Sequence, residues 1–204
     1  MDILQYITNI PADVLRKAIK AEYSEVAIDP HKGYHFHTGR EALTRIGYDP
    51  ELYASLPEEN IASFAGTGNP FCLGPIHPGD VVVDVGSGAG FDSLIAANLV
   101  GPKGRVVGID MTAEMIEKAR NGAVSLGNRN VAFVHGLADD LPVPDGFADV
   151  VISNGVLNMT PDKDKTLNEW SRVLKPGGRL FIGDIAIQKR MTREALDDIS
   201  LWTG

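Results

Sequence analysis

Acidic residues and glycines alternate over a short stretch near the middle of the chain. Residues 81–90 read Val-Val-Val-Asp-Val-Gly-Ser-Gly-Ala-Gly, with Asp84 inside the apolar run. The β-branched run predicts a buried parallel strand, and the glycines that follow let the backbone turn sharply and approach a ligand closely. A second such run ends at Asp110, whose carboxylate can accept hydrogen bonds from a ribose diol. Together these stretches predict a pocket for a nucleotide-type cofactor.

The spacing of the glycines separates two kinds of cofactor. A dinucleotide fingerprint, G-x-G-x-x-G, requires a third glycine where this chain has Phe91. Asp84 and Asp92 bracket the loop, and a carboxylate beside a pyrophosphate would be repelled. S-adenosyl-L-methionine has no phosphate, and carboxylates attract its sulfonium and α-ammonium groups. The residues therefore favour S-adenosyl-L-methionine, and an NAD-dependent oxidoreductase is the less favoured alternative.

The composition limits the class of protein. With 204 residues and 44% hydrophobic content, the chain can form one substantial core, so we expect a single α/β domain with a helical N-terminal addition. The formal net charge of −8 disfavours a protein that binds nucleic acid by neutralising phosphates. A solvated acidic surface accounts for most of this charge. Small neutral or cationic substrates fit it better.

Cys72 is the one cysteine in the sequence. A single cysteine excludes a disulfide within the chain and a metal cluster held by several cysteines. We therefore expect no metal and a reducing cytoplasmic location. No apolar run approaches the length of a membrane span, and residues 1–6 have neither a basic region nor a cleavage site. We expect an unprocessed protein with no membrane partner.

The first 70 residues predict short helices joined by turns. Pro11 is placed to open a helix, and Thr38 with Glu41 has the spacing of a capping box for a second helix that ends at Gly47. The apolar face of the first helix is expected to consist of Val14, Leu15, Ala18 and Ile19. A loop rich in glycine and proline then leads into the core, so we divide the chain into a helical lid or extension, 1–70, and a cofactor-binding domain, 71–204.

Strand and helix patterns alternate from residue 80 onward. This alternation predicts a Rossmann-like α/β fold, a doubly wound and mainly parallel sheet with helices on both faces. We expect strands at 80–85, 105–109, 131–134, 148–153 and 179–184, with helices at 91–99, 113–126 and 161–173. Thr160 is the expected cap of the last helix, with Pro161 in its first position, and Gly177 and Gly178 belong to its stop. Leu167, Trp170 and Leu174 supply its buried stripe.

One further helical segment, 193–201, follows the last predicted strand. A sheet that ended there would leave an edge strand uncovered. We therefore expect either a chain truncated at its C-terminus, whose last strands are missing, or a partner chain that covers the edge, as in a homodimer.

The ordered motifs resemble those of class I S-adenosylmethionine-dependent methyltransferases, over about residues 65–204. The motifs are Val-Asp-Val-Gly-Ser-Gly-Ala-Gly at 83–90, Gly-Ile-Asp-Met at 108–111, Ala-Asp-Asp-Leu-Pro at 138–142, Asp-Val-Val-Ile-Ser-Asn at 149–154 and Val-Leu-Lys-Pro-Gly-Gly-Arg-Leu at 173–180. Within that class, residues 108–112 and 152–163 are most similar to the arsenite methyltransferase-like, or type 11, group.

The resemblance implies a set of cofactor-binding residues. It assigns the methionine half of the cofactor to the glycine loop, the ammonium to Asp84, the ribose to Asp110 and the adenine to Met111, although Leu137 stands where many members have an acid. It also assigns the backbone carbonyl of Asn154 to the amino-acid end. The full set is Asp84, Gly86, Ser87, Gly88, Gly90, Asp110, Met111, Ala138, Asp139 and Asn154.

Simpler structural roles compete with some of these assignments. Asp84 and Asp92 could cap a helix or a loop, Met111 could be core, and Asn154 and Asn158 could be turn residues. No catalytic residue is strictly required, because methyl transfer is an in-line displacement at an activated sulfonium.

Histidines are the candidate bases for a hydroxyl or carbon acceptor. By chemistry alone they are His35, His37 and His135, but a surface or packing role is the favoured interpretation of each. Substrate contacts are expected around His35 and His37, with Tyr34, Phe36 and Arg40, because the resemblance implies an N-terminal segment that covers the pocket.

The arsenite resemblance meets a chemical obstacle. It implies trivalent arsenic held by cysteine thiolates, which are soft ligands for a soft centre. Two of those cysteines align with Thr67 and Gly155, a third would lie beyond Gly204, and Cys72 alone cannot build such a site. We therefore expect a methyltransferase for a small-molecule acceptor. The alternatives are an arsenite methyltransferase-like enzyme with lost cysteine ligands and a non-catalytic relative that binds cofactor or a partner protein.

Overall fold

Five parallel strands form the centre of the protein. The computed structural model describes residues 8–186 and 191–203. The strand order is β3-β2-β1-β4-β5, with β1 (Val81–Val85), β2 (Arg105–Asp110), β3 (Val131–His135), β4 (Ala148–Asn154) and β5 (Leu174–Gly183). The chain order reverses direction between β1 and β4, which is the place where ligands bind in sheets of this kind.

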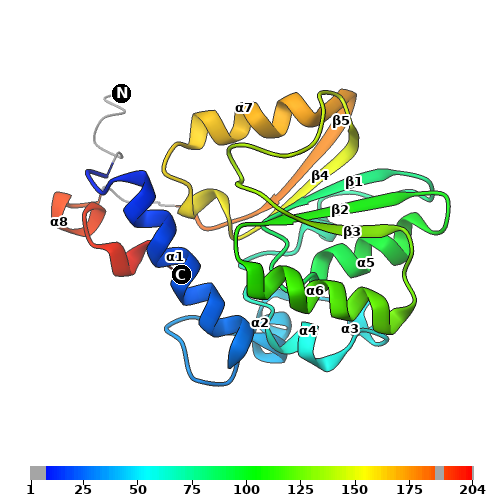
Figure 1. The fold of residues 1–204 in the computed structure, drawn as a ribbon, viewed down its shortest axis with the longest axis horizontal. Helices are drawn as coiled ribbons and strands as arrows, with labels where there is room; N and C mark the ends of the chain where they lie inside the picture. Colours follow the sequence, from blue (N-terminus) through cyan, green and yellow to red (C-terminus); the bar gives the residue numbers. More distant parts are fainter. Residues whose placement is uncertain (1–7, 187–190, 204) are drawn as a thin grey trace.

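Helices cover both faces of the sheet, as predicted (Figure 1). Helices α5 (Phe91–Val100) and α6 (Ala113–Leu126) lie on one face and α7 (Lys163–Val173) lies on the other. Because side chains alternate along a strand, Val82 packs with the residues of α5, whereas its neighbour Val83 packs with Trp170 of α7. Both valines are fully buried. Apart from β5, the bounds of the strands and of α5, α6 and α7 agree with the predicted elements to within a few residues.

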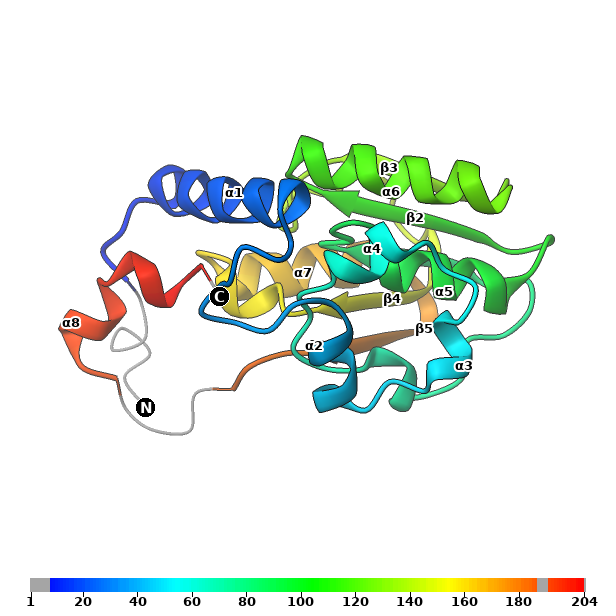
Figure 2. The ribbon, with the colours of Figure 1, turned by 90° about the horizontal axis from the view of Figure 1, so that it is seen from below.

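The N-terminal helices belong to two different parts of the molecule. Helices α2 (Gly39–Ile46), α3 (Pro50–Tyr53) and α4 (Glu58–Ala62), with a 3-10 turn at Pro70–Cys72, form a continuous apolar cluster with α5 and α6. Helix α1 (Ala12–Ile28) instead lies across the carboxyl ends of the strands (Figure 2). The predicted division of the chain at residue 70 stays a prediction.

The first and last described segments of the chain lie side by side, at the end of the sheet where the strands have their carboxyl ends. Helix α8 (Arg193–Leu196) and a 3-10 turn (Ile199–Leu201) sit beside α1 (Figures 1 and 2). Asp197 accepts hydrogen bonds from the backbone and side chain of Asn9, at 2.8 and 2.9 Å. Trp202 packs in an apolar cluster with Leu15 and Ile19 of α1.

Three predicted local details are wrong. The Thr38 hydroxyl does not cap α2 but donates to the carbonyl of Pro30 at 2.9 Å. Helix α7 begins after Asp162, whose carboxylate accepts from the backbone N–H of Lys165, so Thr160 is not its cap. Val14 is 45% exposed and lies off the apolar face of α1. The buried side chains of that face are Leu15, Ile19, Val26 and Ala27, which follow the helical spacing that starts at Leu15.

The fifth strand begins earlier than predicted. Leu174 already pairs with Ala148, and the Pro-Gly-Gly segment that follows makes an irregularity before regular pairing resumes at Arg179. Gly177 has φ +79, a conformation that favours glycine. Helix α7 stops at Val173 and leads directly into the strand, so Gly177 and Gly178 lie within β5 and the prediction that they stop the helix is wrong. In the described part of the chain, no helix is long and apolar enough to span a bilayer; the predicted absence of a leader concerns residues 1–7, which lie outside that part.

Candidate cofactor site

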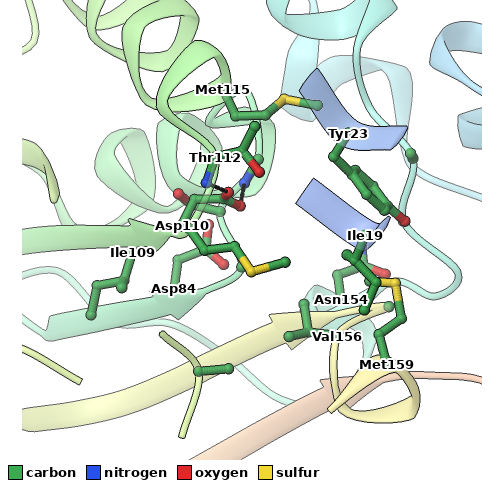
Figure 3. Close-up of a pocket in the computed structure, with 18 of the residues that line it drawn as sticks. Ile19, Tyr23, Asp84, Ile109, Asp110, Thr112, Met115, Asn154, Val156 and Met159 are labelled. Atoms are coloured by element: carbon green, nitrogen blue, oxygen red, sulfur yellow. Dashed lines mark hydrogen bonds between the residues drawn. The ribbon is translucent and has the colours of Figure 1, made fainter. Parts of the chain in front are cut away.

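A pocket opens at the carboxyl ends of β1, β2 and β4, beneath α1. Asp84 of β1, Asp110 of β2 and Asn154 of β4 all line it (Figure 3). The pocket is thus at the point where the strand order reverses. Of the predicted site residues, all except Gly90 line it.

The glycine loop forms one wall of the pocket. Gly86 has φ +72, and a Cβ there would lie 2.2 Å from Cγ2 of Val156, so only glycine fits. Gly88 has φ +51, and its missing Cβ would point into open space, with Sδ of Met115 4.0 Å away. Gly90 serves packing, because a Cβ at that position would meet Phe133 and the Cβ of Ala119 at 2.8 and 2.9 Å.

Ser87 lies between these glycines with an unsatisfied hydroxyl. Its Oγ is buried and has no hydrogen-bond partner among the described residues. An orphaned buried hydroxyl costs free energy unless a ligand or water satisfies it. The loop therefore offers a hydrogen-bonding group to whatever occupies the pocket.

Asp110 is held rigidly by two backbone groups. Its Oδ2 accepts from the N–H of Gly88 at 2.9 Å and its Oδ1 accepts from the N–H of Thr112 at 2.8 Å. Burial raises the pKa of Asp110, while these two backbone hydrogen bonds and nearby His135 oppose that effect. The fixed carboxylate keeps lone pairs available for ligand hydroxyls. Met111, the next residue, both lines the pocket and packs against the cluster around Leu15, so its two predicted roles coexist.

Asp84 and Asp92 form a buried acidic pair below the loop. Their relative exposures are 2% and 6%. Asp84 accepts from the Ser93 hydroxyl at 2.6 Å, and Asp92 accepts from the Tyr48 hydroxyl at 2.7 Å. Burial, followed by the charge of Asp92, raises the pKa of Asp84 to about 8, and burial raises the pKa of Asp92 to about 6. The hydrogen bonds to Asp92 come from side chains of other elements, so it does not act as a cap of α5.

Asn154 ties the pocket to the loop before the domain core. Its Oδ1 accepts from the backbone N–H groups of Thr67 and Gly68, at 2.8 and 2.9 Å. Its Nδ2 donates to the carbonyl of Gly68 at 2.7 Å and to Oδ2 of Asp92 at 3.0 Å. Asn154 is therefore more than a turn residue, because its side chain joins three segments. The role of its backbone carbonyl in binding a ligand stays a prediction.

Asp139 is 6% exposed and is compensated by two cations from different elements. Arg16 of α1 and Lys165 of α7 both donate to its Oδ2, at 2.7 and 2.9 Å. The carbonyl of Ala138 accepts from the indole N–H of Trp170 at 2.9 Å. These bonds fix the loop after β3, which lines the pocket.

Helix α1 supplies a wall of the pocket; an N-terminal covering segment was predicted, but the residues of α1 that form this wall were not. Ile19 and Tyr23 project from it toward Met159 and Val156 (Figure 3). Burial, with the charge of Asp110, raises the pKa of Tyr23 further above its ordinary range. The apolar periodicity of α1 was visible in the sequence, but nothing local showed which partner that face would meet. The remaining lining residues that were not predicted include Ser63–Gly66, Thr112, Met115 and Pro161.

The predicted substrate-contact segment lies elsewhere. His35, His37 and His135 are exposed and do not line the pocket. His37 approaches Glu41 at 3.1 Å, and the His135 ring lies 2.9 Å from the carbonyl of Met111. Arg40 pairs with Glu58, and the rings of Tyr34 and Phe36 stack on each other.

The two positions aligned with thiolate ligands do face each other. A Cβ on Gly155 would lie 3.2 Å from Oγ1 of Thr67. Neither residue offers a thiol, and Cys72 is exposed and outside the pocket lining.

A sequence profile described as "Methyltransferase domain" matches residues 76–202. The matched part contains every strand of the sheet and the whole glycine loop. The chain belongs to the class I S-adenosylmethionine-dependent methyltransferases. The predicted fold and family are thereby confirmed, and the nicotinamide-dependent alternative is not favoured.

Relatives of this methyltransferase domain include arsenite methyltransferases. It is 45% identical over 141 residues to an arsenite methyltransferase of Halobacterium salinarum, covering 69% of this chain and 36% of that protein. It is 41% identical over 109 residues to the ubiquinone/menaquinone biosynthesis C-methyltransferase of Hahella chejuensis, covering 52% of this chain and 43% of that protein. This chain therefore spans less than half of the length of either relative.

Solved structures agree with these matches. An arsenic(III) S-adenosylmethionine methyltransferase from Chlamydomonas reinhardtii superposes with a TM-score of 0.66 and 36% identity, over 71% of this chain and 51% of that one. A SAM-dependent methyltransferase from Aquifex aeolicus gives 0.55 and 28%, over 72% and 80%.

Proposed function

We propose that this chain binds S-adenosyl-L-methionine in the pocket beneath α1 and transfers its methyl group to a small-molecule acceptor. The residues present fit that cofactor. Asp110 is fixed for a ribose diol, Ser87 has a free buried hydroxyl within the loop, and the carboxyl group of Asp84 lines the pocket where it can meet an ammonium group. Ala138, Asp139 and the side chain of Met111 would enclose the adenine, and the carbonyl of Asn154 would meet the amino-acid end.

When bound, the cofactor supplies an electrophilic methyl group on a positively charged sulfur. The chain's own residues then have to bind, orient and exclude water rather than activate the methyl group. Ile19, Tyr23, Val156 and Met159 form an apolar wall on the side of the pocket toward Asn154 (Figure 3). They would hold an acceptor in line with the methyl group and keep bulk water away.

The acceptor that fits this wall is a small organic molecule with an intrinsically nucleophilic atom. No histidine among the described residues lines the pocket, so none is placed to take a proton from the acceptor. The net charge of −8 does not favour a nucleic-acid acceptor. An arsenical acceptor lacks its thiolate ligands here, although the arsenite methyltransferases are similar in sequence.

The proposal extends to the organisation of the chain. We propose that α1, within the segment 1–70, acts as the lid of the pocket, and that residues 71–204 form the cofactor-binding domain. A cytoplasmic location is part of the proposal, because the single exposed thiol suits a reducing compartment. Homodimer formation through the outer side of β5 stays a prediction.

The rigid carboxylate of Asp110 carries this proposal. Its two backbone hydrogen bonds prepare it for a ribose diol, whether or not an acceptor is present. Calorimetric titration with S-adenosylhomocysteine is the test, with NAD as the competing ligand and Asp110→Ala as the variant. Asp164→Ala is the matched control, because Asp164 is exposed on α7 and away from the pocket.

We expect binding of S-adenosylhomocysteine to the wild type and the control, with affinity reduced at least about tenfold in Asp110→Ala, since two hydrogen bonds to a charged group would be lost. Selective binding of NAD would contradict the proposed function. So would equal affinity in all three proteins. Binding without turnover of any acceptor in the full-length protein would instead support the non-catalytic alternative.

A further inference from the structure

The acidic pair of Asp84 and Asp92 lacks a cation of its own. Among the described residues, no ion pair includes either carboxylate. Both residues are buried, at 2% and 6% exposure, and each carboxylate accepts a hydrogen bond shorter than 2.8 Å from a hydroxyl. Two unpaired negative charges in one buried place would be costly, because burial penalises each charge and the charges repel.

The other charged groups around the pocket do not compensate the pair. Arg16 is engaged with Asp139, and Lys118 donates to the Ser63 hydroxyl at 3.0 Å. Asp110 adds a third negative charge that acts on Asp84, and His135 acts on Asp110 instead. Tyr23 and Tyr48, which face the same region, are neutral phenols because burial raises the pKa of each above its ordinary range. The nearby groups therefore leave an excess of negative charge.

We propose that Asp84 and Asp92 share one retained proton in the empty pocket and that the ammonium group of the cofactor displaces it, so that cofactor binding releases a proton to solvent. This inference rests on the proposed function and couples its binding step to the release of one proton. The proton leaves a carboxyl group, the O–H bond breaks, and the ammonium cation replaces the lost positive charge. No other reactant is needed.

The retained proton resides mainly on Asp84. Asp92 accepts from both Tyr48 and Asn154, and it lies in the first turn of α5, where the helix dipole favours a negative charge. Asp84 accepts from the hydroxyl and the backbone of one residue, Ser93, and it is also acted on by the charges of Asp92 and Asp110. The buried Tyr48–Asp92–Asn154 network is thus a positioning unit that keeps Asp92 ionised and leaves the proton on its neighbour.

The test measures proton release with two ligands. S-adenosylhomocysteine carries the ammonium group, whereas 5′-methylthioadenosine keeps the adenosine and lacks the whole amino-acid part. Calorimetric titrations at about pH 7, in buffers with different ionisation enthalpies, give the number of protons released. We expect close to one proton for the first ligand and close to none for the second. The second ligand would contact Asp110, so it also controls for the protonation of that residue.

Two variants of the network should act in opposite directions. Asp92→Asn removes the repelling charge, so the pH dependence of the S-adenosylhomocysteine Kd should shift to lower pH. Tyr48→Phe removes a donor to ionised Asp92, so the dependence should shift to higher pH. In the wild type, Kd should rise by up to about tenfold per pH unit below the pKa of the pair. Asp164→Asn is the control and should leave the profile unchanged.

Binding of S-adenosylhomocysteine without proton release would overturn the inference and leave the proposed function standing. If the ligand does not bind at all, the proposed function fails first, and carbon-13 NMR of the aspartate carboxyl groups decides the inference in the empty protein. A carboxyl assigned to Asp84 by Asp84→Asn that titrates above about pH 6 would support the retained proton. Titration of both residues below about pH 5 would overturn it.

Discussion

The guanidinium of Arg16 donates to Oδ2 of Asp139 at 2.7 Å and so ties α1 across the pocket to the loop after β3. Lys165 donates to the same oxygen at 2.9 Å, but it belongs to α7 and not to the helix above the pocket. The same carboxylate therefore has one partner that closes the pocket and one that does not. Comparing variants of Arg16 and Lys165 can therefore distinguish the effect of holding α1 over the pocket from the effect of neutralising Asp139.

Arg16→Ala should accelerate release of S-adenosylhomocysteine by about two- to fivefold, because a partly exposed ion pair contributes up to about 1 kcal/mol. Lys165→Ala removes the same charge from Asp139 but leaves the lid contact in place, so its release rate should stay close to that of the wild type. Stopped-flow displacement measures both rates. Equal acceleration in the two variants would show that the charge on Asp139, and not the position of α1, controls release.

Two glycines of similar backbone conformation allow the effect of backbone strain on stability to be distinguished from the effect of a lost ligand contact on binding. Gly88 in the pocket and Gly146 outside it have φ values of +51 and +60, and a Cβ at Gly146 would meet nothing within 4 Å. Alanine at either position should cost about 1 kcal/mol of stability, since both must adopt the left-handed conformation. Only Gly88→Ala should also weaken cofactor binding, because its methyl group would project into the pocket.

Urea unfolding and calorimetry of the two glycine variants provide this comparison. Similar losses of stability with a binding defect confined to Gly88→Ala are expected. A binding defect of the same size in Gly146→Ala would mean that global loosening, and not contact with the ligand, weakens the site.

The parts of the structure that follow local rules were predictable from the sequence. Residues 113–126 were predicted as a helix and form α6 with those bounds, and the buried β-branched runs became β1 and β2. The errors at Thr38 and Thr160 have a common cause. Several side chains near a helix start can cap it, and tertiary contacts, such as the Thr38 bond to Pro30, decide which one does.

The walls of the site that come from distant segments were not predictable in the same way. Arg16 and Asp139 are separated by 123 positions, and Tyr48 and Asp92 by 44. No spacing rule connects such pairs, because their contact depends on where α1 and the loop after α2 lie on the finished sheet. The glycine loop and Asp110 were found because strand, turn and acid follow one another along the chain.

The contribution of Asp84 to the stability of the empty protein should fall as pH rises from about 4 to about 8. The pKa of Asp84 in the folded state, about 8, exceeds its value in the unfolded chain, so the folded state holds more protons across this interval. Each proton so held makes the free energy of unfolding decrease by up to about 1.4 kcal/mol per pH unit. Asp84→Asn can still accept from Ser93 and has no proton to lose, so this part of the pH dependence should disappear.

Urea denaturation of the wild type, Asp84→Asn and the exposed control Asp164→Asn at several pH values measures this effect. The control should follow the wild type, and the advantage of the wild type over Asp84→Asn should be largest near the low end of the interval. A constant difference between these two proteins at every pH would mean that Asp84 is ionised in the folded state throughout.

Arsenite should bind this chain weakly and only through its surface thiol. Thr67 and Gly155 are neighbours, since a Cβ on Gly155 would lie 3.2 Å from Oγ1 of Thr67, but neither supplies a soft ligand, and one thiolate alone holds trivalent arsenic poorly. Cys72→Ser should therefore abolish residual arsenite binding while leaving the Kd for S-adenosylhomocysteine within about twofold, because Cys72 is exposed and outside the pocket lining. Parallel titrations of both ligands into both proteins measure this. Tight arsenite binding that survives in Cys72→Ser would restore the arsenical acceptor, and would require ligands other than cysteine to hold it.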